Sequence, residues 1–155
     1  MFEPTPTDHH RKLQALVGEW TGDETMHPSP WDSKGGKATS RRTVRLDLGG
    51  FFLISDYVQL RDGRETYRGH GVYGWDARQG RYTMHWFDAM SGSPAAPALG
   101  TWEGNTLIFQ HQHAMGHTRY TYVFECDGLY TFRLENSPDG KTWTTFLDGT
   151  YRRTA

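Results

Sequence analysis

Apolar and polar residues alternate in much of the second half of the chain. Tyr120, Tyr122 and Phe124 share one parity, and Arg119, Thr121 and Glu125 share the other. The same alternation recurs in the segment YTFRLE that follows. A period of two is typical of a β-strand that buries one face and exposes the other.

Short turn signals separate segments of this kind along the whole chain. Four of them are residue pairs suited to tight hairpins: Gly49–Gly50, Asp62–Gly63, Gly104–Asn105 and Asp127–Gly128. Between the turn signals we predict ten strands. They are Glu19–His27, Thr39–Leu48, Phe51–Leu60, Thr66–Asp76, Arg81–Asp88, Ala98–Glu103, Thr106–Gln112, Thr118–Cys126, Leu129–Ser137 and Trp143–Arg152.

Before the strands, about residues 8–17, the sequence predicts one short helix. Thr7 or Asp8 can cap it, and Leu13 and Leu16 give it an apolar stripe. A helix of this length is not stable alone, so we expect it to dock across one end of a sheet.

The short links force neighbouring strands to pair in sequence order. A flat sheet of ten strands would leave two long exposed edges, and closure into a barrel removes both. We therefore predict an all-β fold: a roughly ten-stranded antiparallel up-and-down β-barrel over about residues 19–153, in a single domain of residues 1–155. The alternation alone is also compatible with a sandwich of two sheets.

Composition agrees with this fold and narrows the function. Aromatic residues make up 14% of the chain and glycines are 18 of its 155 residues, as hairpin-rich β-proteins require. The formal net charge is −1 with both signs interspersed, which argues against nucleic acid and membrane surfaces as partners. One cysteine, Cys126, and no basic-then-apolar leader pattern predict a cytoplasmic protein.

Histidines are the first candidates for chemistry. His111, His113 and His117 are spaced as H-x-H-x-x-x-H, and the first two share one face of a predicted strand. A metal centre needs three or four convergent ligands, and His85 is a further candidate for such a site with His111 and His113. The alternatives are a pocket role, including axial ligation of haem, and half-solvated imidazoles at a barrel mouth.

Other catalytic templates are missing, so we predict a protein without catalytic residues. The glycines of Gly69-x-Gly71-x-x-Gly74 lie inside a predicted strand, where we expect them to permit bends.

Strand parity gives a candidate ligand site. The fifth strand places Met84, Trp86 and Asp88 on one face. A carboxylate in an aromatic cavity needs hydrogen bonds, so Asp88 either orients a polar ligand head or bonds the amides of the loop that follows. The predicted ligand-binding residues are Met84, Trp86, Asp88, Phe109, His111, His113, Tyr122 and Phe124.

The motif Gly18-Glu19-Trp20 resembles the G-x-W signature of the calycin superfamily, which includes the lipocalins. That resemblance implies that Trp20 closes one end of the barrel and that an arginine of the last strand, Arg152, packs across it. Residues 18–22 are also similar to the G-x-W-x-G of the nitrobindins, which hold haem through one histidine. The wider nitrobindin pattern has glycine where this chain has Glu24.

A longer resemblance covers nearly the whole chain. The stretches LQALVGEW, GGFFL, GHGVYGWD, MHWFD, DGK and TYRR occur in this order in a bacterial domain-of-unknown-function family, number 1579. That family is lipocalin-like and has no assigned activity.

Taken together, the sequence predicts a barrel that binds a small, mostly apolar molecule in a cavity of roughly 300–1,000 Å³ without a required cofactor. One alternative is a haem- or metal-binding barrel that uses His111, His113 or His85. Another is a homodimeric interaction module that holds no ligand.

Overall fold

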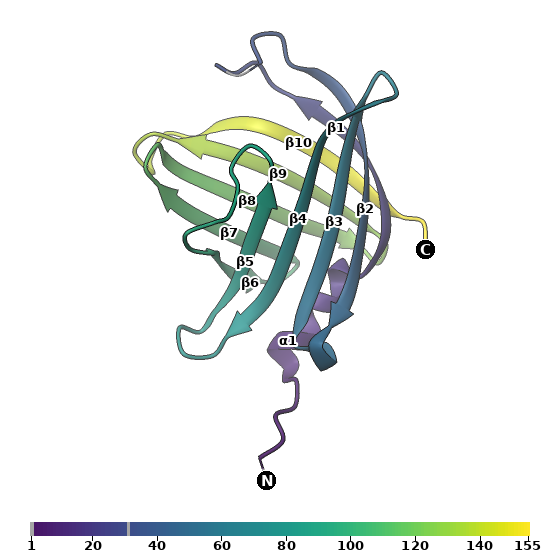
Figure 1. Ribbon diagram of the computed structural model, residues 1–155, viewed down its shortest axis with the longest axis vertical. Helices are drawn as coiled ribbons and strands as arrows, with labels where there is room; N and C mark the ends of the chain where they lie inside the picture. The colour runs from purple at the N-terminus through teal and green to yellow at the C-terminus, as the bar shows by residue number, and fades with distance from the viewer. Residues whose placement is uncertain (1, 31) are drawn as a thin grey trace.

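The computed structural model describes residues 2–30 and 32–155, which form one closed antiparallel barrel (Figure 1). Its helical elements are α1 (Asp8–Lys12) and the 3₁₀ turns η1 (Leu13–Leu16) and η2 (Leu48–Gly50). Its strands are β1 (Gly18–Met26), β2 (Gly36–Asp47), β3 (Phe52–Arg61), β4 (Arg64–Asp76), β5 (Arg81–Asp88), β6 (Ala98–Glu103), β7 (Thr106–His113), β8 (Gly116–Cys126), β9 (Leu129–Ser137) and β10 (Thr144–Arg153). The predicted fold is confirmed.

Closure depends on the pairing of the first strand with the last. Gly22 of β1 pairs with Ser40 of β2 on one side and with Tyr151 of β10 on the other. Each strand therefore has two hydrogen-bonded neighbours, and the described strands leave no open edge. This arrangement decides for a barrel and against the two-sheet alternative.

The N-terminal segment covers one end of the barrel, which we call the closed end. The α-helix is shorter than predicted and passes into η1, whose Leu13 and Leu16 are fully buried. Trp20 lies above them and donates from Nε1 to the Leu16 carbonyl at 2.8 Å. None of the helices in the described part of the chain is long and apolar enough to cross a bilayer.

The arginine over Trp20 is Arg153, so the prediction of Arg152 is wrong. The Arg153 guanidinium lies 4.6 Å from the centroid of the Trp20 ring. Side chains of a strand alternate between faces, and Tyr151 points into the barrel. Arg152 therefore points outward to solvent, whereas Arg153 lies on the same face of the strand as Tyr151 and reaches Trp20.

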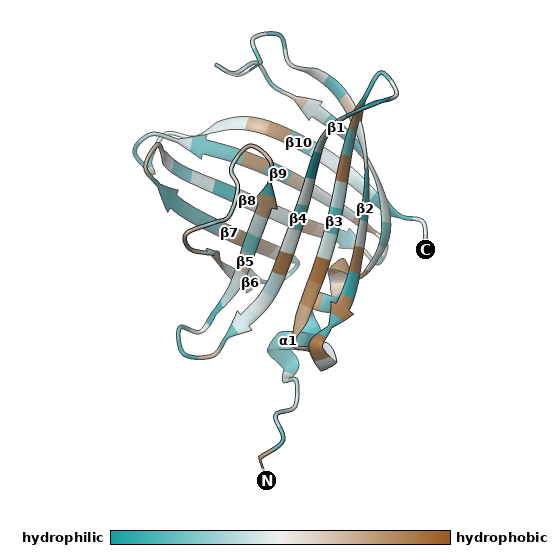
Figure 2. Cartoon of the chain, viewed as in Figure 1, coloured by the Kyte–Doolittle hydropathy of each residue, from teal (hydrophilic) through white to brown (hydrophobic). Residues whose placement is uncertain are grey.

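Hydrophobic and hydrophilic positions alternate along the strands (Figure 2). In β8 and β9 the inward parity is the one predicted, with Tyr122 and Tyr130 buried. In the first half of the chain the inward face is unexpectedly polar. Its buried polar residues are Glu24, Ser40, Arg42, Ser55 and Gln59.

Candidate ligand-binding site

A cavity of about 590 Å³ occupies the barrel interior. Its middle wall is mostly apolar and is formed by Met84, Trp86, Tyr120, Phe132, Leu134 and Leu147. Other lining residues, among them Asp32, Met90 and Ser91, belong to the connections β1–β2 and β5–β6. Those connections lie at the end opposite α1, which we call the mouth (Figure 1).

Glycines of β4 create the space for the largest side chain of this wall. The Trp86 ring lies directly over Gly69 and Gly71. A Cβ at Gly69 would sit 2.0 Å from Cζ2 of Trp86, and one at Gly71 would sit 3.0 Å from its Cε3. A side chain at Gly69 would therefore clash with this ring, and one at Gly71 would crowd it. The bends expected at these glycines stay a prediction of the sequence.

The floor of the cavity, next to the closed end, holds a buried arginine. Arg42 donates from Nε to the Ser55 hydroxyl at 2.8 Å, from Nη1 to that of Tyr130 at 2.9 Å and from Nη2 to that of Tyr73 at 2.6 Å. The Tyr73 and Tyr122 hydroxyls are 2.8 Å apart. We call these five residues the arginine–tyrosine cluster.

The guanidinium of this cluster stays charged. Burial opposes the charge, but the contacts with Tyr130, Tyr73 and Tyr122 outweigh it and hold the pKa of Arg42 well above its ordinary value. Burial also raises the pKa of the Tyr122 and Tyr130 hydroxyls, so both keep their protons at neutral pH. The floor is therefore a positive, donor-rich surface.

A buried carboxylate lies nearer the mouth. Glu24 accepts hydrogen bonds from the Tyr57 hydroxyl at 2.6 Å and 2.8 Å, from Gln59 Nε2 at 3.1 Å and from the Tyr151 hydroxyl. Burial and the neighbouring carboxylate raise the pKa values of Tyr57 and Tyr151. Three donors from β3 and β10 thus satisfy the side chain of Glu24, which is only 2% exposed.

Asp88 anchors the loop between β5 and β6. Its Oδ1 accepts from the backbone amides of Met90 at 2.9 Å and Ser91 at 2.6 Å, and its Oδ2 accepts from the Tyr67 hydroxyl at 2.6 Å. Burial would raise the pKa of Asp88, but these hydrogen bonds outweigh it and lower the pKa. The same Tyr67 hydroxyl accepts from Nε1 of Trp86 at 2.6 Å, which ties the cavity wall to the loop.

The structure does not bring His85, His111 and His113 together. His85 has the parity opposite to Met84 and Trp86 and points away from the cavity. The rings of His111 and His113 stack with centroids 5.6 Å apart near the mouth, outside the cavity lining. Within residues 2–30 and 32–155, no three His, Cys, Asp or Glu side chains gather as a metal site requires.

His113 instead supports the β7–β8 hairpin. Its Nδ1 accepts from the Met115 amide at 3.2 Å, and its Nε2 lies 2.9 Å from the Thr118 hydroxyl. Burial and the charges of His111 and His117 lower the pKa of His113. The neutral imidazole therefore fits this position best.

The other predicted ligand-binding residues separate into two groups. Met84, Trp86, Asp88 and Tyr122 line the cavity. Phe109 has the same inward parity but is fully buried against the rings of Tyr73 and Tyr122. Phe124 is stacked on Trp102 at 5.3 Å, and it too lies outside the lining.

Sequence reasoning named Asp88 and Tyr122 but missed the other polar residues of the cavity. Arg42 and Glu24 both line it, together with Tyr57, Gln59 and Tyr67. Parity does mark the inward face of both strands: Glu24 shares it with Trp20 and Met26, and Arg42 shares it with Val44 and Leu46. These apolar companions are the signal that could have found both residues, although a charged side chain by itself argues against an inward position.

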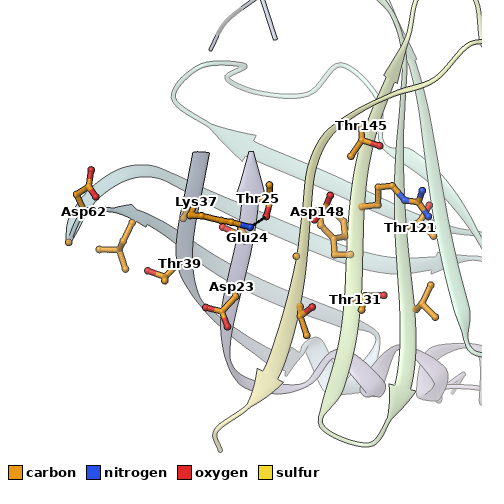
Figure 3. Close-up of a pocket in the computed structure, with 18 residues that line it drawn as sticks. Asp23, Glu24, Thr25, Lys37, Thr39, Asp62, Thr121, Thr131, Thr145 and Asp148 are labelled. Atoms are coloured by element: carbon orange, nitrogen blue, oxygen red, sulfur yellow. Dashed lines mark hydrogen bonds between the residues drawn. The ribbon is translucent and has the colours of Figure 1, made fainter. Parts of the chain in front are cut away.

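A second hollow, of about 920 Å³, lies along β1, β2, β8, β9 and β10 (Figure 3). It carries threonines and scattered charges of both signs, such as Asp23, Asp148 and Lys37. The one hydrogen bond drawn there runs from Nζ of Lys37 to the Thr25 hydroxyl at 2.7 Å. Because its charged groups do not converge, the barrel interior is the stronger candidate site.

Comparison with known proteins agrees with the fold. The family described as "Protein of unknown function (DUF1579)" matches residues 5–153. Among curated proteins, none matches this chain in sequence.

Solved structures share the architecture at low sequence identity. Rv2717c from M. tuberculosis superposes with a TM-score of 0.71 at 12% identity, covering 96% of this chain and 99% of its own. The S-type phycobiliprotein lyase CPES from Guillardia theta gives a TM-score of 0.71 at 11% identity, covering 95% and 93%. A redesigned β-barrel, b11L5F_LGL, gives 0.51 at 14%, covering 94% and 96%. At these identities the likeness is one of fold.

Proposed function

This chain belongs to the DUF1579 family of proteins of unknown function, and we propose that it binds a small, mostly apolar molecule inside its barrel. One observation carries the proposal: an internal cavity of about 590 Å³ that is reached from the mouth. That volume lies within the range of ordinary small-molecule sites. A barrel that served only as a scaffold would fill this space with side chains, as small barrels do.

The composition of the lining supports an apolar body for the ligand. Met84, Phe132, Leu134 and Leu147 face the space between the floor and the mouth, and Trp86 adds a flat aromatic wall. Burial of an apolar ligand against such a wall contributes roughly 25 cal/mol per Å² removed from water. Few polar groups lie among these residues, so this part of the wall selects a ligand by its shape and apolar surface rather than by hydrogen bonds.

The mouth supports entry of a ligand from solvent. Met90 and Ser91 line the cavity and belong to the loop that Asp88 anchors. Arg61 and Asp32 form an ion pair of 2.8 Å on the opposite part of the lining. The polar groups at this end would keep the entrance hydrated while the interior stays apolar. Cytoplasmic location and independence of a cofactor stay predictions of the sequence.

The test uses an uncharged fluorescent probe, N-phenylnaphthylamine, titrated into the purified protein. We expect saturable binding with enhanced probe fluorescence. Leu134→Trp adds bulk inside the cavity and should reduce affinity at least tenfold. Arg133→Trp is the matched control, because the adjacent side chain is exposed and points away from the cavity.

Native mass spectrometry of the same preparations would show whether a cellular molecule co-purifies with the wild type and is lost from Leu134→Trp. Two results would contradict the proposal. One is the absence of saturable probe binding to folded wild-type protein. The other is an equal loss of affinity in both tryptophan variants, which would place the probe on the outer surface.

A further inference from the structure

The arginine–tyrosine cluster has more hydrogen-bond donors than acceptors. Arg42 uses three N–H groups on the hydroxyls of Ser55, Tyr73 and Tyr130. Its described partners are all hydroxyls, and among the described residues no carboxylate forms an ion pair with it. A buried charge held only by neutral groups is costly, and buried positive charges are usually paired with negative ones.

Counting protons shows where the surplus lies. The Tyr130 hydroxyl accepts from Arg42, and the described residues provide no acceptor for its own proton. Tyr73 also accepts from Arg42, so the bond between Tyr73 and Tyr122 uses only one of their two hydroxyl protons. Whichever residue donates, one proton of that pair and the proton of Tyr130 have no described acceptor. Donation by the guanidinium makes these hydroxyls stronger donors.

The surplus donors face the cavity. Arg42, Tyr73, Tyr122 and Tyr130 all line it. Tyr130 contacts Trp20 edge-on at 4.7 Å, which places the cluster directly above the closed end. A ligand that enters from the mouth therefore meets the apolar wall with its body and this cluster with its leading end.

We propose that the cluster is an anion subsite, and that the ligand carries a carboxylate bound by the Tyr122 and Tyr130 hydroxyls with the charge of Arg42 behind them. This inference rests on the proposed function and specifies its ligand class: an apolar molecule with one carboxylate at its deep end. Hydrogen bonds from protonated hydroxyls to a charged oxygen are among the stronger ones in proteins.

Glu24 limits which anion fits. Its carboxylate faces the same cavity, and its charge adds to the cost of every negative group that enters. Its oxygens are already bonded to Tyr57, Gln59 and Tyr151, so it has little capacity to take up donors of the ligand. The charges of Arg42 and Glu24 already sum to zero in this cavity, so each negative charge on a ligand leaves it net negative. A monoanion such as a carboxylate therefore fits better than a dianion such as a phosphate monoester.

A matched pair of probes tests this assignment. Pyrenebutyrate and pyrenebutanol have the same aromatic body and differ in the charged or neutral oxygen at the chain end. Fluorescence titration should give at least tenfold tighter binding of pyrenebutyrate to the wild type, as expected for hydrogen bonds to a charged group. Tyr122→Phe should remove most of that preference and change pyrenebutanol binding less than twofold.

Two further variants keep the test decisive. Tyr73→Phe breaks the link between Arg42 and Tyr122 and should lower the same preference, which covers the case in which Tyr122→Phe does not fold. Tyr82→Phe is the matched control. Its buried hydroxyl bonds the His9 carbonyl at 2.9 Å outside the cavity lining, so the preference should persist there.

The outcomes separate the inference from the proposed function. If N-phenylnaphthylamine binds but pyrenebutyrate binds no better than pyrenebutanol, the anion subsite is wrong and the apolar binding site stands. The same conclusion follows if Tyr122→Phe and Tyr73→Phe both fold and keep the preference. If none of the three probes binds, both proposals fail.

Discussion

Replacement of Arg153 by alanine tests the closure of the barrel. Arg153 stacks on Trp20 at 4.6 Å and donates to the carbonyls of Val17 and Ala15, each at 3.1 Å. Cation–π stacking contributes about 0.5–2 kcal/mol, and each hydrogen bond about 1 kcal/mol. Its ion pair with Asp127 adds little, because that carboxylate is 94% exposed.

We therefore expect Arg153→Ala to lower the free energy of unfolding by about 3 kcal/mol. For a domain of this size that loss corresponds to a fall in Tm of roughly 6–12 °C. Urea and thermal unfolding followed by tryptophan fluorescence and circular dichroism would measure it. Because Trp20 lies under the guanidinium, the emission of the folded protein should also change.

Arg152→Ala is the internal control for this experiment. Arg152 is exposed on the outer face of the same strand, so its truncation should change the free energy of unfolding by less than about 0.5 kcal/mol. Equal losses in the two variants, or a loss below about 0.5 kcal/mol in Arg153→Ala, would refute the assignment of Arg153 as the residue that secures the closed end.

Two other predictions concern the cavity wall and the mouth. In Gly69→Ala the new Cβ would meet the Trp86 ring, so the ring should turn into the cavity. We expect the free energy of unfolding to fall by roughly 1–3 kcal/mol and the probe to bind more weakly. Unchanged probe binding would contradict this packing. The pKa of Asp88 is lowered in the folded protein, so its stabilisation of the loop is complete above the unfolded value of about 4 and is lost as the pH falls through the folded value. The protection factors of the Met90 and Ser91 amides, which correct for the pH dependence of intrinsic exchange, should therefore fall in acid in the wild type. In Asp88→Asn they should be lower than in the wild type at neutral pH and should not change with pH.

The candidate site was predicted in part, and the failures have a common geometry. Met84, Trp86 and Tyr122 line the cavity. Their inward position could be predicted because their strands alternate between apolar and polar residues. Phe109 has the correct parity as well, but it lies at a level where packed rings fill the barrel. Parity identifies the face of a strand, whereas height along the barrel decides between cavity and core.

The polar half of the site depends on partners that are distant in sequence. Arg42 is one of two adjacent arginines. Its parity, shared with Val44 and Leu46, separates it from the outward Arg41, but its charge argues against burial. Its guanidinium is accommodated inside the barrel because Tyr130, 88 positions later, and Ser55 offer it hydroxyls. Glu24 likewise has Tyr151 as a partner 127 positions away.

The sequence by itself determined the ten strands and their order, because alternation and turn residues act over a few neighbouring positions. The closing role of Trp20 was implied by the resemblance of Gly18-Glu19-Trp20 to the calycin signature. The tertiary structure alone decided that Arg153 covers Trp20, that the histidines stay outside the cavity, and which distant hydroxyls satisfy Arg42 and Glu24. These outcomes depend on strand register and on side chains that meet across the closed barrel. A local pattern contains no information about such contacts.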